Sequence, residues 1–137
     1  MNPIVVGIDG SEHSLRAGRL AAEIAAGAEA KLVFVYSIPP MYAGVPALII
    51  PPEAIAQMQQ AGQDILTRAA KVLERSDAER VVVEGPPAPM LAQVAHDKEA
   101  SLLVVGSHGM GLVRRFLVGS VADRVMHLAE RPVLVVR

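Results

Sequence analysis

A glycine-rich stretch late in the chain has the spacing of an anion-binding site. Gly-Ser-His-Gly occupies residues 106–109, and nine residues later comes the pair Gly119-Ser120. Glycines let backbone N–H groups approach a bulky anion, and the N-terminus of a helix adds a positive dipole. The spacing therefore predicts a ligand that carries phosphate.

Three common motifs do not fit this stretch. A P-loop needs lysine and a hydroxyl residue after its second glycine, but Leu112 and Val113 follow Gly111. The dinucleotide fingerprint Gly-x-Gly-x-x-Gly begins at Gly109 and Gly111 and is not completed. The nucleophile elbow Gly-x-Ser-x-Gly is absent from the sequence. These mismatches exclude the Walker, dinucleotide and hydrolase interpretations.

A second candidate group is Asp9-Gly10-Ser11, which directly follows an apolar run. Two interpretations stay open: a turn with Ser11 as a helix cap, or a carboxylate that faces a ligand. The four histidines, at positions 13, 96, 108 and 127, lack the close spacing of a structural zinc site. Ser107 and His108 are expected to contribute backbone rather than side chain.

The elements that must position these residues alternate between strand and helix. Apolar runs predict strands at 4–8, 31–37, 80–84, 101–106 and 133–136, with helices at 12–27, 52–75, 90–98 and 120–129. This alternation predicts an α/β fold with a parallel sheet and right-handed crossovers. Ligands of such sheets bind beyond the carboxyl ends of the strands. Asp9 and the glycine stretch meet there if the first and fourth strands are neighbours.

Composition and charge narrow the class of protein. The 137 residues are 52% hydrophobic but only 3% aromatic, so the core must consist of Val, Leu, Ile and Ala. A net charge of −1 provides no basic field for nucleic acid or an anionic membrane. The chain has no cysteine, no apolar stretch of membrane-spanning length and no signal-peptide pattern at its start. We expect one cytoplasmic domain over residues 1–137.

Five stretches of sequence carry a resemblance to a known family. They are 5–11 (Val-Val-Gly-Ile-Asp-Gly-Ser), 85–88 (Gly-Pro-Pro-Ala), 103–109, 119–121 and 131–137. In these stretches the chain resembles the universal stress protein family, in its ATP-binding branch, over essentially its whole length. The family's ATP-binding signature, Gly-x-x-Gly-x9-Gly-Ser, is intact. The resemblance implies an open five-stranded parallel sheet with helices on both faces. This is a Rossmann-like, adenine nucleotide alpha hydrolase-like fold with strand order 3-2-1-4-5.

The resemblance also implies the ligand and its contacts. The ligand would be ATP, AMP or ADP, with Mg²⁺ reached by Asp9 through the nucleotide. Val35 resembles the position whose backbone reads the adenine edge, and the pair at 119–120 resembles the residues that hold the phosphates. The expected nucleotide-binding residues are Gly7, Asp9, Val35, Gly106, Ser107, His108, Gly109, Met110, Gly111, Arg115, Gly119, Ser120 and Val121.

Three functions stay open at the level of sequence. The first is an ATP-binding stress-response or regulatory module with at most slow hydrolysis, because no Walker lysine or water-activating Glu or Gln lies near the glycines. The second is a nucleotide-free protein that binds partners, as some family members do. The third is an adenylyl-transfer enzyme, whose His-x-Gly-His signature is absent here. No catalytic residue is expected.

Two segments are candidates for interactions. If the strand at 133–136 forms a sheet edge, its unpaired backbone invites pairing, and the resemblance implies a homodimer through residues 132–137. The apolar stretch 39–52 contains prolines that oppose regular structure. A flap beside the adenine pocket, a contact with a partner subunit and a loop folded onto its own sheet are all compatible with its sequence.

Overall fold

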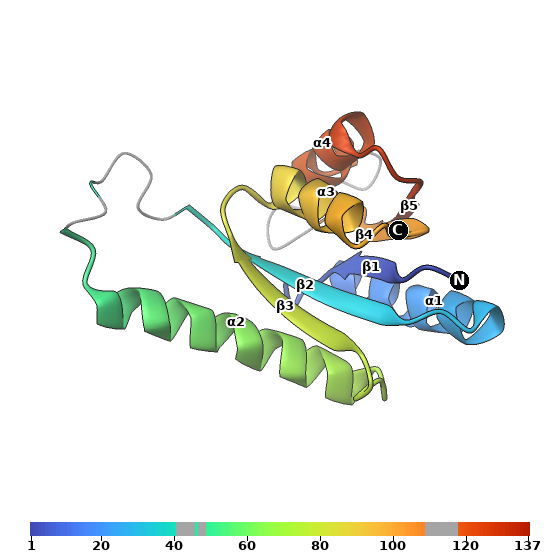
Figure 1. Cartoon of the computed structure of the whole chain (residues 1–137), viewed down its shortest axis with the longest axis horizontal. Coiled ribbons are helices and arrows are strands. Elements are labelled where there is room, and N and C mark those ends of the chain that lie inside the picture. The colour runs from blue at the N-terminus through green and yellow to red at the C-terminus, as the bar shows by residue number, and fades with distance from the viewer. Residues whose placement is uncertain (41–45, 47–48, 109–117) are drawn as a thin grey trace.

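Strands and helices alternate along the chain as the sequence predicts (Figure 1). The computed structural model describes residues 1–40, 46, 49–108 and 118–137. The strands are β1 (Ile4–Gly7), β2 (Leu32–Ile38), β3 (Glu79–Glu84), β4 (Leu102–Gly106) and β5 (Val133–Val136). The helices are α1 (Glu12–Ala28), α2 (Pro52–Val72), α3 (Pro87–Asp97) and α4 (Ser120–Leu128).

The sheet is wholly parallel and has the order β3-β2-β1-β4-β5, which confirms the predicted fold class. β1 is the central strand and pairs with both β2 and β4. From β1 the chain adds β2 and β3 on one side and then returns to add β4 and β5 on the other, so the strand order reverses at β1. The carboxyl ends of β1 and β4 are therefore neighbours, and this is the position where such folds bind ligands.

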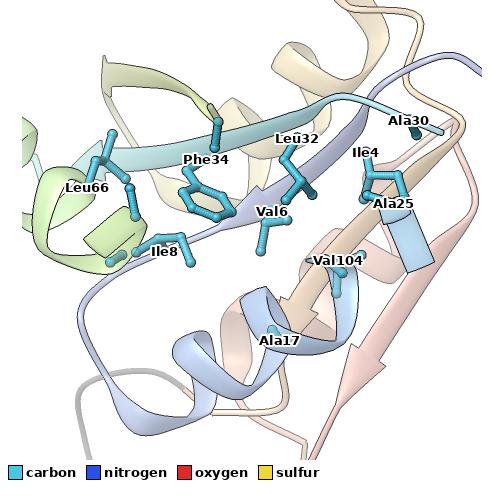
Figure 2. Close-up of a cluster of buried hydrophobic side chains, with 14 residues drawn as sticks. Ile4, Val6, Ile8, Ala17, Ala25, Ala30, Leu32, Phe34, Leu66 and Val104 are labelled. Atoms are coloured by element: carbon cyan, nitrogen blue, oxygen red, sulfur yellow. The ribbon is translucent and has the colours of Figure 1, made fainter. Parts of the chain in front are cut away.

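Helices cover both faces of the sheet, with α1 and α2 on one face and α3 and α4 on the other (Figure 1). Successive residues of a strand point to opposite faces, so β1 divides its side chains between two cores. On one face, Val6 belongs to a cluster with Phe34 of β2 and Leu66 of α2, as Figure 2 shows. On the other face, Val5 belongs to a cluster with Leu91 of α3 and Val125 of α4. Alanines on the helices let them pack closely on this Val-rich sheet.

The starts of two helices differ in how they are specified. Ser11 caps α1 as predicted, because its hydroxyl oxygen accepts the N–H of Ser14 at 3.2 Å. α3 begins at Pro87, three residues before the predicted start at Met90. Proline suits this first turn, because N–H groups there have no acceptor within the helix.

Three helices end in the same way. A glutamate with a left-handed φ of 50–54° follows each helix. Glu29 comes directly after α1, and Glu74 and Glu99 come two residues after the ends of α2 and α3. The next N–H reaches back five residues in every case: Ala30 to Ala25, Arg75 to Ala70 and Ala100 to Ala95, at 2.8–2.9 Å. This is a Schellman ending, in which glycine is the usual left-handed residue. Gly27 lies near the end of the first helix, as predicted, but the left-handed position is taken by Glu29.

Two sequence interpretations fall on residues that the structure does not describe. Half of the apolar stretch 39–52 lies outside the described residues, at 41–45 and 47–48, and so does the segment 109–117. Among the helices of the described part, none has the length and apolar character needed to cross a membrane.

Candidate functional site

A cavity of about 500 Å³ lies at the carboxyl ends of β1, β2 and β4. Its wall is formed by the turn after β1, the end of β2, the start of α3, the residues after β4 and the start of α4. The predicted contact residues that line it are Gly7, Asp9, Val35, Gly106, Ser107, His108, Gly119, Ser120 and Val121. The other predicted contacts, Gly109, Met110, Gly111 and Arg115, lie outside the described residues.

Asp9 lines the cavity and also holds the turn after β1. Its carboxylate oxygen Oδ1 accepts the N–H of Ser11 at 2.8 Å, and its own N–H donates to Oγ of Ser14 at 3.3 Å. Gly10 has a φ of +87°, a conformation that favours glycine. The turn-and-cap interpretation is therefore confirmed, and the same turn brings the carboxylate to the cavity wall.

Gly106 is required by the packing of α1 on the end of β4. A Cβ atom at this position would lie 2.8 Å from the carbonyl carbon and oxygen of His13. His13 is in the first turn of α1, so the absence of a side chain at Gly106 lets this turn rest on β4. A close approach of two chain segments thus explains this glycine without any ligand.

Gly119 joins the start of α4 to the residue after β4. Its N–H donates to the carbonyl oxygen of Ser107 at 2.6 Å, and a Cβ atom would lie 2.8 Å from that oxygen. The φ of Gly119 is −64°, so close approach explains the glycine here, and a positive φ does not. No side chain caps α4, and the first-turn N–H groups of Ser120 and Val121 have no acceptor within the helix.

The rings of two histidines, one in the first turn of α1 and one shortly after β4, contact each other. The rings of His13 and His108 have centroids 5.2 Å apart and an interplanar angle of 56°. Ser107 is only 2% exposed, and its Oγ lies 3.0 Å from Nδ1 of His108. Within the described part of the chain, Nδ1 of His13 and Nε2 of His108 are buried without a hydrogen-bond partner.

At the other end of the cavity, the carbonyl of Val35 is already used within the sheet. It accepts the N–H of Ile8 at 2.8 Å. In a parallel strand, alternate residues direct their backbone groups to the same neighbour, so Ser37 directs its groups to the side where β1 has ended. The Ser37 hydroxyl donates to the carbonyl of Gly85 at 2.7 Å, which ties β2 to the loop before α3.

Sequence reasoning missed several residues of the wall. The family resemblance pointed to Val35, and the alternation of backbone groups along β2 would have pointed to Ser37 as well, so that residue could have been found. Pro87, the first residue of α3, lines the cavity, and so does Leu91 of the same helix. Leu91 lies so close to the sheet that a Cβ atom on Gly7 would be 3.0 Å from its Cδ1. The missed residues are Ile8, Tyr36, Ser37, Pro39, Pro87, Leu91, Val105 and Ala122.

The cavity wall carries little charge. Among the lining residues that the structure describes, Asp9 is the acidic group and there is no lysine or arginine. No three His, Asp or Glu side chains of the described residues gather closely enough to hold a metal ion. A divalent cation at Asp9 would therefore need other ligands, such as phosphate oxygens and water.

Comparison with known proteins places this fold and cavity among related sequences. The model of the universal stress protein family matches residues 1–137. A universal stress protein of Methanocaldococcus jannaschii is 35% identical over 138 residues, which are 98% of this chain and 81% of that protein.

Two similar solved structures contain a nucleotide. A universal stress protein in complex with cAMP is 32% identical, with a TM-score of 0.65 over 99% of this chain and 96% of the other. The universal stress protein of Archaeoglobus fulgidus in complex with dAMP is 26% identical. Its TM-score is 0.71 over 100% of this chain and 98% of that one.

Proposed function

The chain belongs to the universal stress protein family, and we propose that it is a cytoplasmic stress-response or regulatory module that binds ATP or another adenine nucleotide. The observation that carries this proposal is the convergence of the predicted contact residues on one cavity. They come from segments far apart in the sequence, yet all those that the structure describes line the same wall. A volume of about 500 Å³ is also typical of a small-molecule site.

The start of α4 supports a place for phosphate. The N–H groups of Ser120 and Val121 have no helical acceptor, and the nine-residue helix behind them adds its dipole. The bond from Gly119 to Ser107 fixes this helix start against the end of β4. Phosphate oxygens would accept from these amides and from the Ser120 hydroxyl.

The end of β2 supports a place for the adenine base. Val35 and Leu91 supply apolar wall, as a flat aromatic base requires. We assign the polar contacts of the base edge to the backbone of Ser37 as well as to the predicted Val35. The reason is that the Val35 carbonyl already accepts a bond from Ile8, whereas Ser37 extends past the end of β1.

Asp9 is suited to a magnesium-bound polyphosphate. Mg²⁺ is commonly held by one or two carboxylates together with phosphate oxygens and water. Asp9 would supply the carboxylate, and the cation would offset the repulsion between Asp9 and the phosphates. The described lining holds no Glu or Gln to orient an attacking water, so we propose binding with at most slow hydrolysis.

Two relatives favour an adenine nucleotide without deciding how many phosphates it carries. The related structures contain cAMP and dAMP, which share adenine and a single phosphate group. The intact glycine signature favours ATP. A monophosphate, in turn, would need less cationic compensation in a cavity lined by Asp9.

Nucleotide released from the purified protein tests the proposal. We expect denaturation to release an adenine nucleotide that chromatography identifies. We also expect Mg-ATP, AMP or cAMP to raise the melting temperature with ligand concentration, because ligands stabilise the state they bind. No released nucleotide and no thermal shift would favour a nucleotide-free, partner-binding protein. Turnover above about 1 s⁻¹, the low end for ordinary enzymes, would instead indicate an enzyme.

We also propose a homodimer formed through residues 132–137. β5 is an edge strand, and its residues Val133–Val136 are only partly buried. Unpaired edges of this kind are usually covered or paired in folded proteins. Antiparallel pairing of two copies of β5 across a two-fold axis would close both edges at once.

A further inference from the structure

The two unpartnered histidine nitrogens are the most unusual polar atoms in the described structure. Buried polar atoms in folded proteins almost always have a partner, so each exception calls for an explanation. Here both exceptions, Nδ1 of His13 and Nε2 of His108, belong to rings that contact each other. His108 also lines the proposed nucleotide cavity. A missing ligand group is one explanation, and the state of His108 decides which kind of group fits.

The hydrogen bond between Ser107 and His108 indicates the tautomer of the ring. If the Ser107 hydroxyl donates to Nδ1, both atoms are satisfied, and one buried group, the Nε2–H, has no partner. If Nδ1–H donates instead, the hydroxyl hydrogen of the buried Ser107 and the lone pair of Nε2 both lack partners. The first arrangement leaves fewer buried groups unsatisfied and is therefore favoured.

The free edge of the His108 ring lies beside the start of α4. Its Cδ2 atom, which is bonded to Nε2, is 3.7 Å from the position that a Cβ atom of Gly119 would occupy. On another side, the His13 ring packs against it at a tilt of 56° and restricts its rotation. The ring edge formed by Cδ2 and Nε2 is thus held beside Gly119, the residue that precedes α4.

We propose that Ser107 holds His108 in the Nε2–H tautomer and that this N–H donates to a phosphate oxygen of the bound nucleotide. The inference rests on the proposed function and extends it, because it gives the site a side-chain donor for the phosphate. His108 would be a binding residue and Ser107 a positioning residue. The sequence had predicted backbone roles for both, and the contact between Ser107 Oγ and His108 Nδ1 gives their side chains a function.

The first test is the tautomer in ligand-free protein. Protein labelled with ¹⁵N-histidine would be studied by long-range ¹H–¹⁵N correlation, which distinguishes a protonated from an unprotonated ring nitrogen. We expect the Nε2–H tautomer of His108 in the wild type, and Ser107→Ala to give a mixture of tautomers. An Nδ1–H tautomer in the wild type would overturn the inference, whether or not the protein binds nucleotide.

The second test compares AMP with adenosine, which lacks the phosphate. His108→Gln keeps an amide donor near the position of Nε2, whereas His108→Asn places its amide near Nδ1. We expect His108→Asn to lower the ratio of AMP to adenosine affinity roughly tenfold or more, as loss of a hydrogen bond to a charged group does. We expect His108→Gln to restore most of that ratio. His96→Asn, the same change at an exposed surface histidine, should leave the ratio unaltered.

The outcomes separate this inference from the proposed function. An unchanged ratio in His108→Asn, with AMP still bound, would overturn the phosphate contact while leaving nucleotide binding intact. Failure of the wild type to bind AMP, ATP or cAMP would contradict the proposed function and the phosphate contact together.

Discussion

Gly106 and Gly119 lie where two segments of chain approach more closely than a side chain would allow. At Gly106 the neighbour is the backbone of His13, and at Gly119 it is the carbonyl of Ser107. The sequence interpretation assigned these glycines to the approach of a ligand anion. The structure adds that they are also required to bring α1 and α4 onto the end of β4. A glycine signature can thus preserve the shape of a site through packing within the chain.

Substitution of Gly119 by alanine tests this explanation. The new Cβ atom would meet the Ser107 carbonyl oxygen at 2.8 Å, so the start of α4 must shift. We expect a loss of about 1–3 kcal/mol in the free energy of unfolding, typical of overpacking, and at least a tenfold loss of ATP affinity. Urea denaturation and calorimetric titration would measure the two effects.

Gly27→Ala is the matched control for this prediction. Among the described residues, no atom lies within 4 Å of the position that the new methyl group would occupy. The residue is inside α1, so alanine should stabilise the protein by about 0.5–1 kcal/mol. If Gly119→Ala were as stable as Gly27→Ala, the close contact with Ser107 would not constrain α4.

At the scale of single elements, three helices end with the same unfavourable backbone conformation, a left-handed residue that is not glycine. Glu29, Glu74 and Glu99 each occupy the left-handed position of a Schellman ending. A residue with a Cβ atom is disfavoured in this conformation by about 1–2 kcal/mol, whereas glycine is not. The same ending at three helices of one small protein means that this cost is incurred three times.

Glycine at these positions should stabilise the fold. We expect Glu99→Gly to raise the free energy of unfolding by about 1 kcal/mol, and the triple variant with Glu29→Gly and Glu74→Gly to add nearly the full sum, because the sites are separate. Glu23→Gly, at an exposed position inside α1, should instead lower it by about 1 kcal/mol. Urea unfolding curves of the wild type, Glu99→Gly, the triple variant and Glu23→Gly would measure these changes in the free energy of unfolding. Destabilisation by Glu99→Gly would contradict the argument.

The elements were largely predictable because their signals are local. The periodicity of apolar residues located every strand and helix of the described chain, and Ser11 marked the start of α1. The start of α3 was misplaced, because the prolines at 86, 87 and 89 favour a loop or a first helical turn about equally. The contact between His13 and His108 could not be predicted, because it depends on how α1 packs against β4, and no local pattern encodes that packing.

On the scale of the whole molecule, the edge of the sheet at β5 has backbone groups that point away from its neighbour β4. β3 and β5 are the outer strands. Leu103 donates to the carbonyl of Pro132 and Ser107 to that of Val136, so alternate residues of β5 face β4. By the same alternation, Val133 and Val135 direct their backbone groups away from the sheet. These outward groups are the ones that a second copy of β5 would use.

Val135→Pro therefore tests the proposed dimer. It removes an outward N–H while leaving the bonds to β4, so we expect the dimer to dissociate and the monomer to stay folded. Sedimentation analysis at micromolar concentration would give the mass, and circular dichroism would report the fold. Arg80→Pro makes a similar change on the outer strand β3 and should leave the mass unaltered. A monomeric wild type would contradict the proposal.

The pairing of β1 with β4 has a consequence for biosynthesis. It aligns Ile4 with Leu102 and Val6 with Val104, so the central seam of the sheet joins residues made early to residues made late. A nascent chain on the ribosome has no complete cavity until β4 and the start of α4 have emerged. If the proposed nucleotide binds this cavity, it could stabilise only a chain in which β4 and the start of α4 have already joined β1. Its binding would then follow the assembly of the sheet rather than guide the first steps of folding.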